Sequence, residues 1–276
     1  MSSSGRRPSR LILLFVALIT AASACAQDRV VVMSYNILRP EWAKPADPAW
    51  GQRVGGIVKL LGTHTPDIAG LQEENDSMVA DLLDRLPDYA YLYPVPEKGG
   101  RLLFRYRTWT PLAVRQENGP GGRVLTEALF RGPGGRRLYV YNAHFSPFEE
   151  KARLEAAALL ARMIATRAET SVPVVVTGDL NSVPGSPPLR FLTQDDGGPR
   201  LTDPFAALGL PSPRTADAYT AHRPGAGIRL DFVLFAGALR PLGANAIEDK
   251  PDGVYPSDHL PVCAVFSWEP PPRQRP

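Results

Sequence analysis

Cysteine is scarce in this sequence of 276 residues, which has only Cys25 and Cys263. If Cys25 is removed with the N-terminal segment described below, no disulfide within the chain is possible. The fold then depends on its hydrophobic core, and a chain of this length with 44% hydrophobic residues has enough material for one. Cys263 lies in the apolar run PVCAVFSW, which predicts a buried side chain that serves as a small hydrophobe.

An apolar run long enough to cross a membrane is missing from the N-terminal segment. The run LILLFVALI, residues 11–19, is too short for a span, follows three arginines and precedes the small residues AASACA. This pattern predicts a secretory signal peptide over residues 1–26, with cleavage after Ala26, and therefore an exported protein, periplasmic or extracellular. The alternative is that ASAC is a lipoprotein site, in which case Cys25 is lipidated and anchors the protein to a membrane.

An excess of charge of one sign is missing as well. The chain has 31 Lys and Arg against 28 Asp and Glu, and the three arginines of residues 1–26 leave 28 basic against 28 acidic in the mature protein. A neutral chain lacks the broad basic field that holds nucleic acid. Arg101, Arg105 and Arg107 alternate and are predicted to share one strand face, either as a phosphate-binding patch or as an ordinary polar surface.

What the sequence has is an alternation of strand-like runs with a few helical ones. The pattern predicts helices that begin near Asp47 and Ser146 and another over Asp76 to Leu86, with loops over residues 184–228. Two β-rich halves, each with its own helices, predict two packed sheets in one domain over residues 27–268, followed by a disordered tail at 269–276. The predicted strands are 29–36, 67–73, 101–107, 110–117, 123–131, 136–145, 172–177, 229–235 and 260–268.

Polar side chains recur at the ends of these strands. In VVVTGDLNSVP, three valines end at Asp179 and Asn181, which point to the same side of a strand because they are two residues apart. Each such residue alone is explained as a strand cap, but several buried carboxylates need a cation or donors to offset their charge. Oxygen ligands suit Mg²⁺, Mn²⁺ or Ca²⁺ rather than zinc. The residues concerned are Asn36, Glu73, His144, Asp179, Asn181, Asp231, Asp258 and His259.

Six segments occur in the order found in the endonuclease/exonuclease/phosphatase superfamily, and the chain resembles that superfamily over residues 29–268. The segments are SYNI, DIAGLQE, NAHFSP, VVVTGDLNSVP, RLDFVLF and YPSDHLPV. The resemblance implies a four-layer α/β/β/α sandwich of two mostly antiparallel sheets with helices outside. It also implies metal-dependent hydrolysis of a phosphoric ester.

The same resemblance implies a metal site for Mg²⁺ or Mn²⁺. Glu73 resembles the metal-binding glutamate, and Asn36 resembles the asparagine beside it that supports the metal or the phosphate. Asp258 looks like a second acid at the metal.

The resemblance also assigns five catalytic residues. Asp179 resembles the aspartate that orients and deprotonates the attacking water, and Asn181 the asparagine that holds a phosphate oxygen. His259 resembles the histidine on the phosphate, and Asp231 the acid that orients its imidazole. His144 falls where the family often has a histidine that donates to the substrate.

One departure from the pattern affects the expected substrate. Secreted nucleases of the superfamily pair the histidine at the position of His144 with an acid on a neighbouring strand, where this chain has Gly and Arg. Glu127, on another strand, either replaces that acid or is a solvated surface residue. No long basic insertion is present. Trp42, in the loop after Asn36, is either a lid over the site or a hydrophobic anchor.

These observations predict an exported, monomeric, Mg²⁺-dependent phosphoric ester hydrolase, in which an activated water attacks a phosphodiester or phosphomonoester in line. The expected ligand is a phosphorylated small molecule or a lipid headgroup, with no stable protein partner. One alternative is a secreted non-specific endonuclease that acts on nucleic acid. Another is a non-catalytic member that binds a phosphorylated ligand or a protein.

Overall fold

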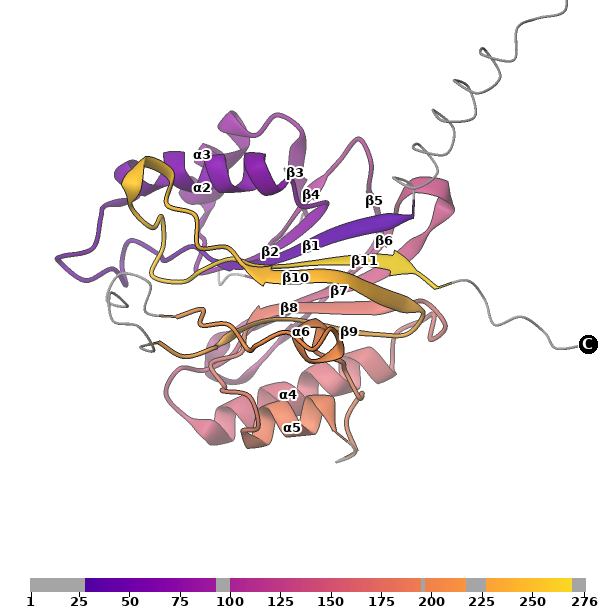
Figure 1. Ribbon diagram of the computed structural model, residues 1–276. Coiled ribbons are helices and arrows are strands. Elements are labelled where there is room, and N and C mark those ends of the chain that lie inside the picture. Colours follow the sequence, from indigo (N-terminus) through magenta and orange to yellow (C-terminus); the bar gives the residue numbers. More distant parts are fainter. Residues whose placement is uncertain (1–27, 93–99, 195–196, 217–226, 270–276) are drawn as a thin grey trace, which may run out of the picture.

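A computed structural model describes residues 28–92, 100–194, 197–216 and 227–269 of the chain (Figure 1). The predicted signal peptide, with Cys25, and all of the predicted tail after Glu269 lie outside these residues. Two sheets pack face to face, and helices cover the outer face of each (Figure 1). This arrangement confirms the predicted α/β/β/α sandwich. Within the described residues, no helix has the length and apolar character needed to cross a membrane.

The first sheet has six strands and carries two helices on its outer face. In it, only β1 and β2 run parallel; the other neighbouring strands are antiparallel. Helices α2 (Trp50–His64) and α3 (Asp76–Arg85) lie against its outer face (Figure 1). The strand order is β10 (Leu239–Ala246), β11 (Val262–Trp268), β1 (Arg29–Asn36), β2 (Ile68–Gln72), β4 (Leu102–Arg105) and β3 (Tyr89–Tyr91).

The second sheet has five strands, of which only β7 and β8 run parallel. Helices α4 (Glu150–Ala165) and α5 (Pro187–Thr193) cover its outer face, and the short α6 (Pro204–Ala207) lies near β9 and β10. Three 3-10 turns, η1 (Pro120–Gly122), η2 (Pro133–Gly135) and η3 (Pro251–Gly253), complete the elements. The strand order is β5 (Thr110–Asn118), β6 (Val124–Arg131), β7 (Arg137–His144), β8 (Val174–Asp179) and β9 (Asp231–Ala236).

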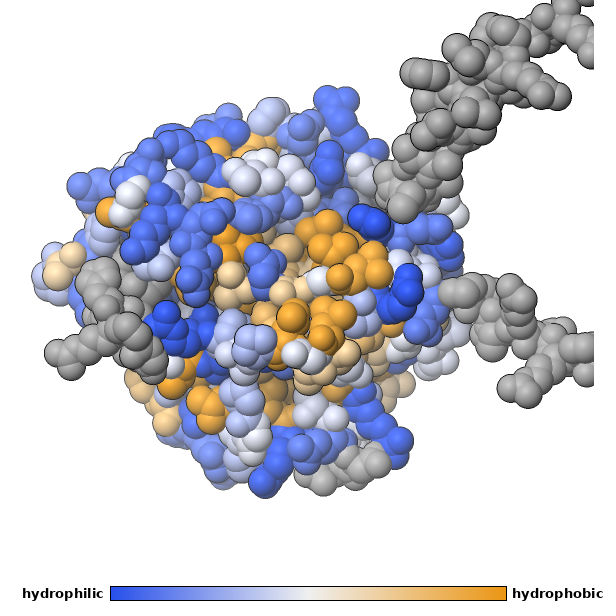
Figure 2. All heavy atoms as spheres, viewed as in Figure 1, coloured by the Kyte–Doolittle hydropathy of each residue, from blue (hydrophilic) through white to orange (hydrophobic). Residues whose placement is uncertain are grey.

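Three hydrophobic layers stabilise the sandwich. Val30 and Val32 of β1 pack between the sheets, whereas Met33 and Tyr35 pack under the helices of their own sheet. Both faces of β1 are therefore buried, which explains the continuous apolar run from Val30 to Met33. On the face seen in Figure 2, hydrophobic residues gather mainly over the middle of the molecule, where the sheets lie, and the helices present mostly hydrophilic residues.

A small polar cluster joins the two sheets near one end. Gln72 Nε2 donates to Asn142 Oδ1 over 2.7 Å, and Thr177 Oγ1 lies 3.1 Å from the same oxygen. Gly70 faces this cluster, and a Cβ on Gly70 would lie 2.0 Å from Thr177 Oγ1. Glycine is therefore required at position 70, because the sheets approach closely here.

The helix starts predicted near Asp47 and Ser146 are too early, because the N-caps lie two and three residues later, at Ala49 and Glu149. Helix α2 has Ala49 as its N-cap, and the Asp47 carboxylate instead accepts a hydrogen bond from the Lys44 backbone N–H. Ser146 Oγ accepts from the backbone N–H groups just ahead of α4 and so closes a turn before the helix. Both polar residues are used in local turns, for which their short side chains are equally suited.

Two predictions about surface charge are also wrong. Arg101 is buried and pairs with Asp76, whereas Arg107 lies beyond the end of β4 and is exposed, so the arginines do not form a common patch. Glu127 is not a solvated surface residue; it is buried and accepts from Arg115 Nη2 over 2.7 Å. It therefore does not supply the acid expected behind His144.

Candidate active site

The candidate site lies where the carboxyl ends of both parallel strand pairs meet. In the second sheet, His144 pairs in register with Asp179, and Asp179 with Asp231, so three polar residues stand side by side on β7, β8 and β9. In the first sheet, Asn36 pairs in register with Gln72 at the ends of β1 and β2. Because parallel strands end at the same edge, residues far apart in sequence are brought together here.

Asn36 joins the two sheets at this edge. Its Nδ2 donates to Glu73 Oε1 over 2.9 Å and to Asp179 Oδ2 over 3.0 Å, while its Oδ1 accepts from the Leu38 N–H. The side chain is fully buried. Asn36 therefore holds the two carboxylates close to each other by giving each of them one amide hydrogen.

Glu73 directly follows β2 and has a positive φ of 62°. This left-handed backbone is unfavourable for a residue with a side chain and occurs mainly where the surrounding structure holds it for a purpose. Glu73 Oε2 accepts from the Arg39 backbone N–H over 3.2 Å. Burial raises the pKa of Glu73, although the hydrogen bond from Asn36 and the charge of His259 oppose the shift.

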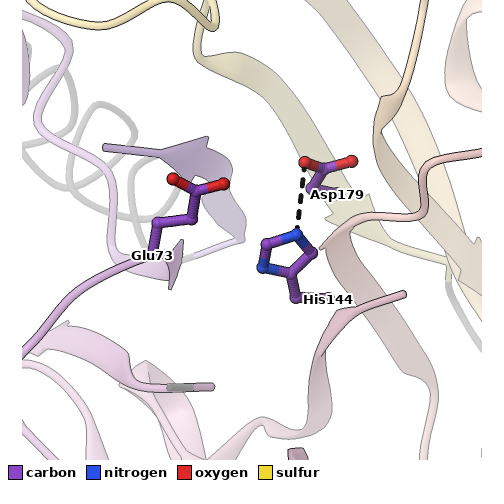
Figure 3. A group of neighbouring side chains, drawn as sticks. All are labelled: Glu73, His144 and Asp179. Carbon is purple, nitrogen blue, oxygen red and sulfur yellow. Dashed lines mark ion pairs between the residues drawn. The ribbon is translucent and has the colours of Figure 1, made fainter. Parts of the chain in front are cut away.

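Asp179 stands at the centre of the site. Its Oδ1 accepts from the Asn181 backbone N–H over 3.0 Å, and its Oδ2 lies 3.6 Å from His144 Nε2 and 3.9 Å from His259 Nδ1. Burial, followed by the charge of Asp231, raises the pKa of Asp179 to about 7. A carboxylate with a pKa near neutrality is well suited to accept a proton. The side chains of Glu73, His144 and Asp179 point toward one another (Figure 3).

His259 and Asp231 form a pair beside Asp179. His259 Nδ1 is 2.8 Å from Asp231 Oδ2, and Asp231 is itself fully buried, with its backbone N–H donating to Thr215 Oγ1. Burial alone lowers the pKa of His259, but the charges of Asp231 and Asp179 outweigh it and raise that pKa well above its usual value. His259 is therefore an imidazolium near neutral pH, with Nε2–H left as a donor.

His144 has the opposite electrostatic character. Its Nδ1 lies 3.0 Å from Nη1 of Arg123, which always carries its proton and so acts as the donor. Burial, and then the charges of Arg123 and His259, lower the pKa of His144 well below its usual value. The site thus contains one cationic and one neutral histidine.

Two further predicted residues lie at the edge of this group. Asn181 has a positive φ of 44°, and its Nδ2 donates to the Phe145 carbonyl, which uses one of its two amide hydrogens. Asp258 accepts weakly from Ser257 Oγ at 3.4 Å, and burial raises its pKa. All eight residues predicted from the sequence therefore lie in one region.

A model of one protein family matches residues 33–259, and its description is the endonuclease/exonuclease/phosphatase family. This match covers most of the chain, including all eight predicted site residues. The chain belongs to the endonuclease/exonuclease/phosphatase family. Membership makes it a phosphoesterase, and the sandwich described above is the fold expected for such a protein.

Several solved structures share the fold of this family member. An endonuclease/exonuclease/phosphatase from Bacteroides vulgatus has a TM-score of 0.76 at 21% identity, covering 87% of this chain and 99% of that one. A mannosyl-6-phosphatase from Bacteroides thetaiotaomicron has a TM-score of 0.73 at 19% identity, covering 87% and 100%. D. rerio TDP2 with a single-stranded DNA product has a TM-score of 0.71 at 20% identity, covering 87% and 99%. No curated protein matches the sequence.

The donor set fits the divalent cation on which enzymes of this family depend. Within the described residues, ligand atoms lie within 4.8 Å of one another in two groups, Glu73–His144–Asp179 and Asp179–Asp231–His259. Because His259 is an imidazolium paired with Asp231, the first group is the better candidate. Glu73 and Asp179 give it oxygen ligands, which suit a hard cation. Asp258 belongs to neither group, though its charge reaches Glu73 and raises the pKa of that residue.

Sequence reasoning missed several residues that position the site. Arg53, in the first turn of α2, is buried and donates to the backbone carbonyls of Ile37, Leu38 and Pro256. It thereby ties the loop after β1 to the loop that carries Asp258 and His259. An arginine in an amphipathic helix gives no sign of this role in the sequence, because only the tertiary fold brings those carbonyls together.

The sequence also did not predict that three side chains, Arg39, Trp42 and Arg123, form one group. The guanidinium carbons of Arg39 and Arg123 each lie 4.9 Å from the centroid of the Trp42 ring. The Trp42 ring therefore supports two cations beside the site. This role differs from both predicted ones, a lid over the site and a hydrophobic anchor.

Proposed function

We propose that this protein is an exported, Mg²⁺-dependent phosphoric ester hydrolase in which an activated water attacks a phosphodiester or phosphomonoester in line. The single observation that carries the proposal is the position of Asp179. This buried carboxylate, with a pKa of about 7, adjoins the Asn36–Glu73 pair on one side and the cationic His259 on the other. A base, a metal-binding acid and a cationic donor thus surround one small volume.

Each residue has a role that follows from its contacts. Asp179 orients the attacking water and takes its proton, and Asn36 keeps the carboxylate in place. His259, held by Asp231, donates Nε2–H to a non-bridging phosphoryl oxygen as negative charge develops there. His144, neutral and fixed by Arg123, donates Nε2–H to the substrate, and Asn181 offers its second amide hydrogen to a phosphate oxygen.

Glu73, with Asn36 beside it and Asp258 nearby, would hold the metal ion, and Asp179 is the nearest further carboxylate. A divalent cation at this position neutralises charge on the phosphoryl group and stabilises the leaving oxygen. Mg²⁺ is the expected ion and Mn²⁺ a substitute, because both prefer oxygen ligands and accept substrate phosphate as a further ligand.

The neutral mature chain favours a small phosphate ester or a lipid headgroup over polymeric DNA. The burial of Arg101 and its pairing with Asp76 support this, because that arginine does not add to a basic surface. A secreted endonuclease remains the second candidate, since the fold is shared by TDP2 with bound DNA as well as by a mannosyl-6-phosphatase. A non-catalytic binding protein is the third, but the grouping of all predicted site residues argues against it.

The experiment is a substrate panel on purified residues 27–276 with Mg²⁺. The panel contains a chromogenic phosphomonoester and diester, phospholipid headgroup esters and supercoiled plasmid. Turnover of small esters or headgroups that stops with EDTA supports the proposal, and nicking of plasmid with no turnover of small esters supports the endonuclease. Binding of these compounds without turnover of any of them would support the third candidate, a non-catalytic binding protein.

Export, monomeric state and anchoring are proposals that rest on the sequence of residues 1–26 and on the size of the core. Expression of the full chain with a C-terminal tag, followed by fractionation and mass spectrometry, tests them. We expect a soluble exported monomer that begins at Gln27. A lipid-modified Cys25 in the membrane fraction would instead show the lipoprotein form.

A further inference from the structure

A cavity of about 300 Å³ adjoins the site on the side of Glu73 and His144. Asp179, Asp231, Asp258 and His259 do not line it, so it continues the site away from the proposed base. A substrate with its phosphoryl group near Asp179 would place another part of itself here. The lining includes Arg39, Trp42, Gln72, Glu73, Arg123 and His144.

The part of the lining that the structure describes carries a net positive charge. Among the described lining residues, Arg39 and Arg123 are cations and Glu73 is the single carboxylate. A divalent cation on Glu73 would make the lining more positive still. Such a cavity favours an anionic group on the ligand.

The two guanidinium groups are held in place before any ligand arrives. Each lies over the Trp42 ring at 4.9 Å, Arg123 also donates to His144, and Arg39 donates to the Glu74 carbonyl. Flexible arginines lose conformational freedom when they bind an anion, so this prior ordering favours binding. A planar guanidinium with several N–H donors also matches a phosphate or carboxylate better than an ammonium does.

Two buried polar atoms of lining residues lack partners among the described residues. Gln72 Oε1 is buried and accepts no hydrogen bond, although Gln72 Nε2 makes three, and Arg39 Nε is buried without an acceptor. Buried unpaired polar atoms are uncommon. Neither atom is exposed to the cavity, so the two guanidinium groups, rather than these atoms, favour an anionic ligand.

We propose that Arg39 and Arg123, supported by Trp42, form a subsite for a second anionic group of the substrate. The substrate class is a small phosphate ester that carries a further phosphate or carboxylate, such as a sugar bisphosphate or a nucleoside bisphosphate. This inference rests on the proposed function and makes its substrate more specific. The size of the cavity suits one such group and excludes a folded partner.

The test compares matched substrates that differ by one phosphate: glucose 6-phosphate with glucose 1,6-bisphosphate, and AMP with adenosine 3′,5′-bisphosphate. We expect the wild type to prefer the bisphosphate of at least one pair by about tenfold or more in kcat/KM, mainly through KM. The sugar and nucleoside pairs distinguish the two sources of the second phosphate. Equal rates within both pairs, with clear turnover, would overturn the subsite and leave the proposed function standing.

The variants Arg39→Gln and Arg123→Gln should each reduce that preference about tenfold, and Arg39→Lys should restore part of it by keeping the charge. Arg240→Gln is the matched control, because Arg240 is exposed on β10 and away from the cavity. It should leave the preference unchanged. Melting temperatures show that each variant is folded.

Calorimetric binding of both bisphosphates to Asp179→Asn gives a readout that needs no turnover. Binding weakened about tenfold by adding Arg39→Gln, but not by adding Arg240→Gln, supports the subsite even if no ester is hydrolysed. Binding that is unaffected by Arg39→Gln overturns it. Absence of hydrolysis from the wild type is a failure of the proposed function alone.

Discussion

Arg123 donates from Nη1 to His144 Nδ1 over 3.0 Å. A guanidinium has no acceptor, so the hydrogen bond leaves Nδ1 without a proton and puts the ring proton on Nε2. Secreted nucleases of the superfamily have a carboxylate behind this histidine; the sequence has Gly and Arg there and left open whether Glu127 replaces the acid. The chain instead has a cation there, which makes His144 a neutral hydrogen-bond donor rather than a general acid.

The first prediction concerns the protonation of His144. At pH 7 its ring should be neutral with the proton on Nε2, because burial and Arg123 lower its pKa well below the usual value. Nitrogen-15 spectra of the imidazoles should show this tautomer, with no titration between pH 6 and 8. In Arg123→Gln the pKa of His144 should rise. A protonated His144 at pH 7 in the wild type would refute the assignment.

The second prediction is the pH dependence of kcat/KM. Asp179 must be ionised to accept a proton, so the rate falls as the pH drops through its pKa of about 7, or lower once a cation is bound. His259 must be protonated to donate, so the rate also falls as the pH rises through its raised pKa. The result is a bell-shaped profile.

The variant His259→Gln separates the two limbs of that profile. Glutamine keeps a donor but does not titrate, so the alkaline limb should disappear while the acid limb stays and the rate falls by about 10²-fold. The profile is measured from pH 5 to 10 with a chromogenic diester. An alkaline limb that persists unchanged in this variant would assign it to another group.

The third prediction concerns metal binding. Glu73→Gln should weaken Mn²⁺ binding at least ~10-fold and turnover at least ~10²-fold, because the variant loses a charged ligand. Electron paramagnetic resonance of free Mn²⁺ measures the affinity without any substrate. Glu117→Gln, at an exposed position of β5, is the matched control and should bind as the wild type does. Equal Mn²⁺ affinity in Glu73→Gln and the control would place the metal elsewhere.

The fourth prediction concerns the contact between the sheets. Gly70→Ala places a methyl group 2.0 Å from Thr177 Oγ1 and 2.6 Å from Asn142 Oδ1, so we expect a loss of about 1–3 kcal/mol in the free energy of unfolding. Gly55→Ala is the control: no atom lies within 4 Å of its added Cβ, and alanine favours the helix there. Denaturant unfolding should show Gly70→Ala less stable and Gly55→Ala at least as stable as the wild type.

The fold and the main site residues could be predicted from the sequence because each depends on local patterns. Runs such as VVVTGD identify buried strands, and residues that end parallel strands necessarily meet at one edge, as His144 and Asp179 do. The order of six segments then gave the superfamily. Helix starts at Asp47 and Ser146 were wrong because short polar side chains close turns as readily as they cap helices.

The rest depends on contacts between distant segments. Arg39 and Arg123 lie 84 positions apart and meet only at Trp42, and Arg53 contacts a loop about 200 residues away. The alternating pattern of its strand predicts that Glu127 is a surface residue, but helix α4 covers that face of the sheet. Arg115 donates both to Glu127 and to the Met163 carbonyl of this helix. No periodicity in the sequence predicts which polar residue another element will cover.

The central claim is that Asp179 is the base of a metal-dependent phosphoesterase, and the most direct measurement is the turnover of a chromogenic phosphodiester by wild type and Asp179→Asn with Mg²⁺. Asparagine keeps the size of the side chain but cannot take a proton, so kcat should fall about 10²–10⁴-fold in a variant that melts within a few degrees of the wild type. EDTA should abolish the wild-type rate. A folded Asp179→Asn protein that turns over within tenfold of the wild type would contradict the account.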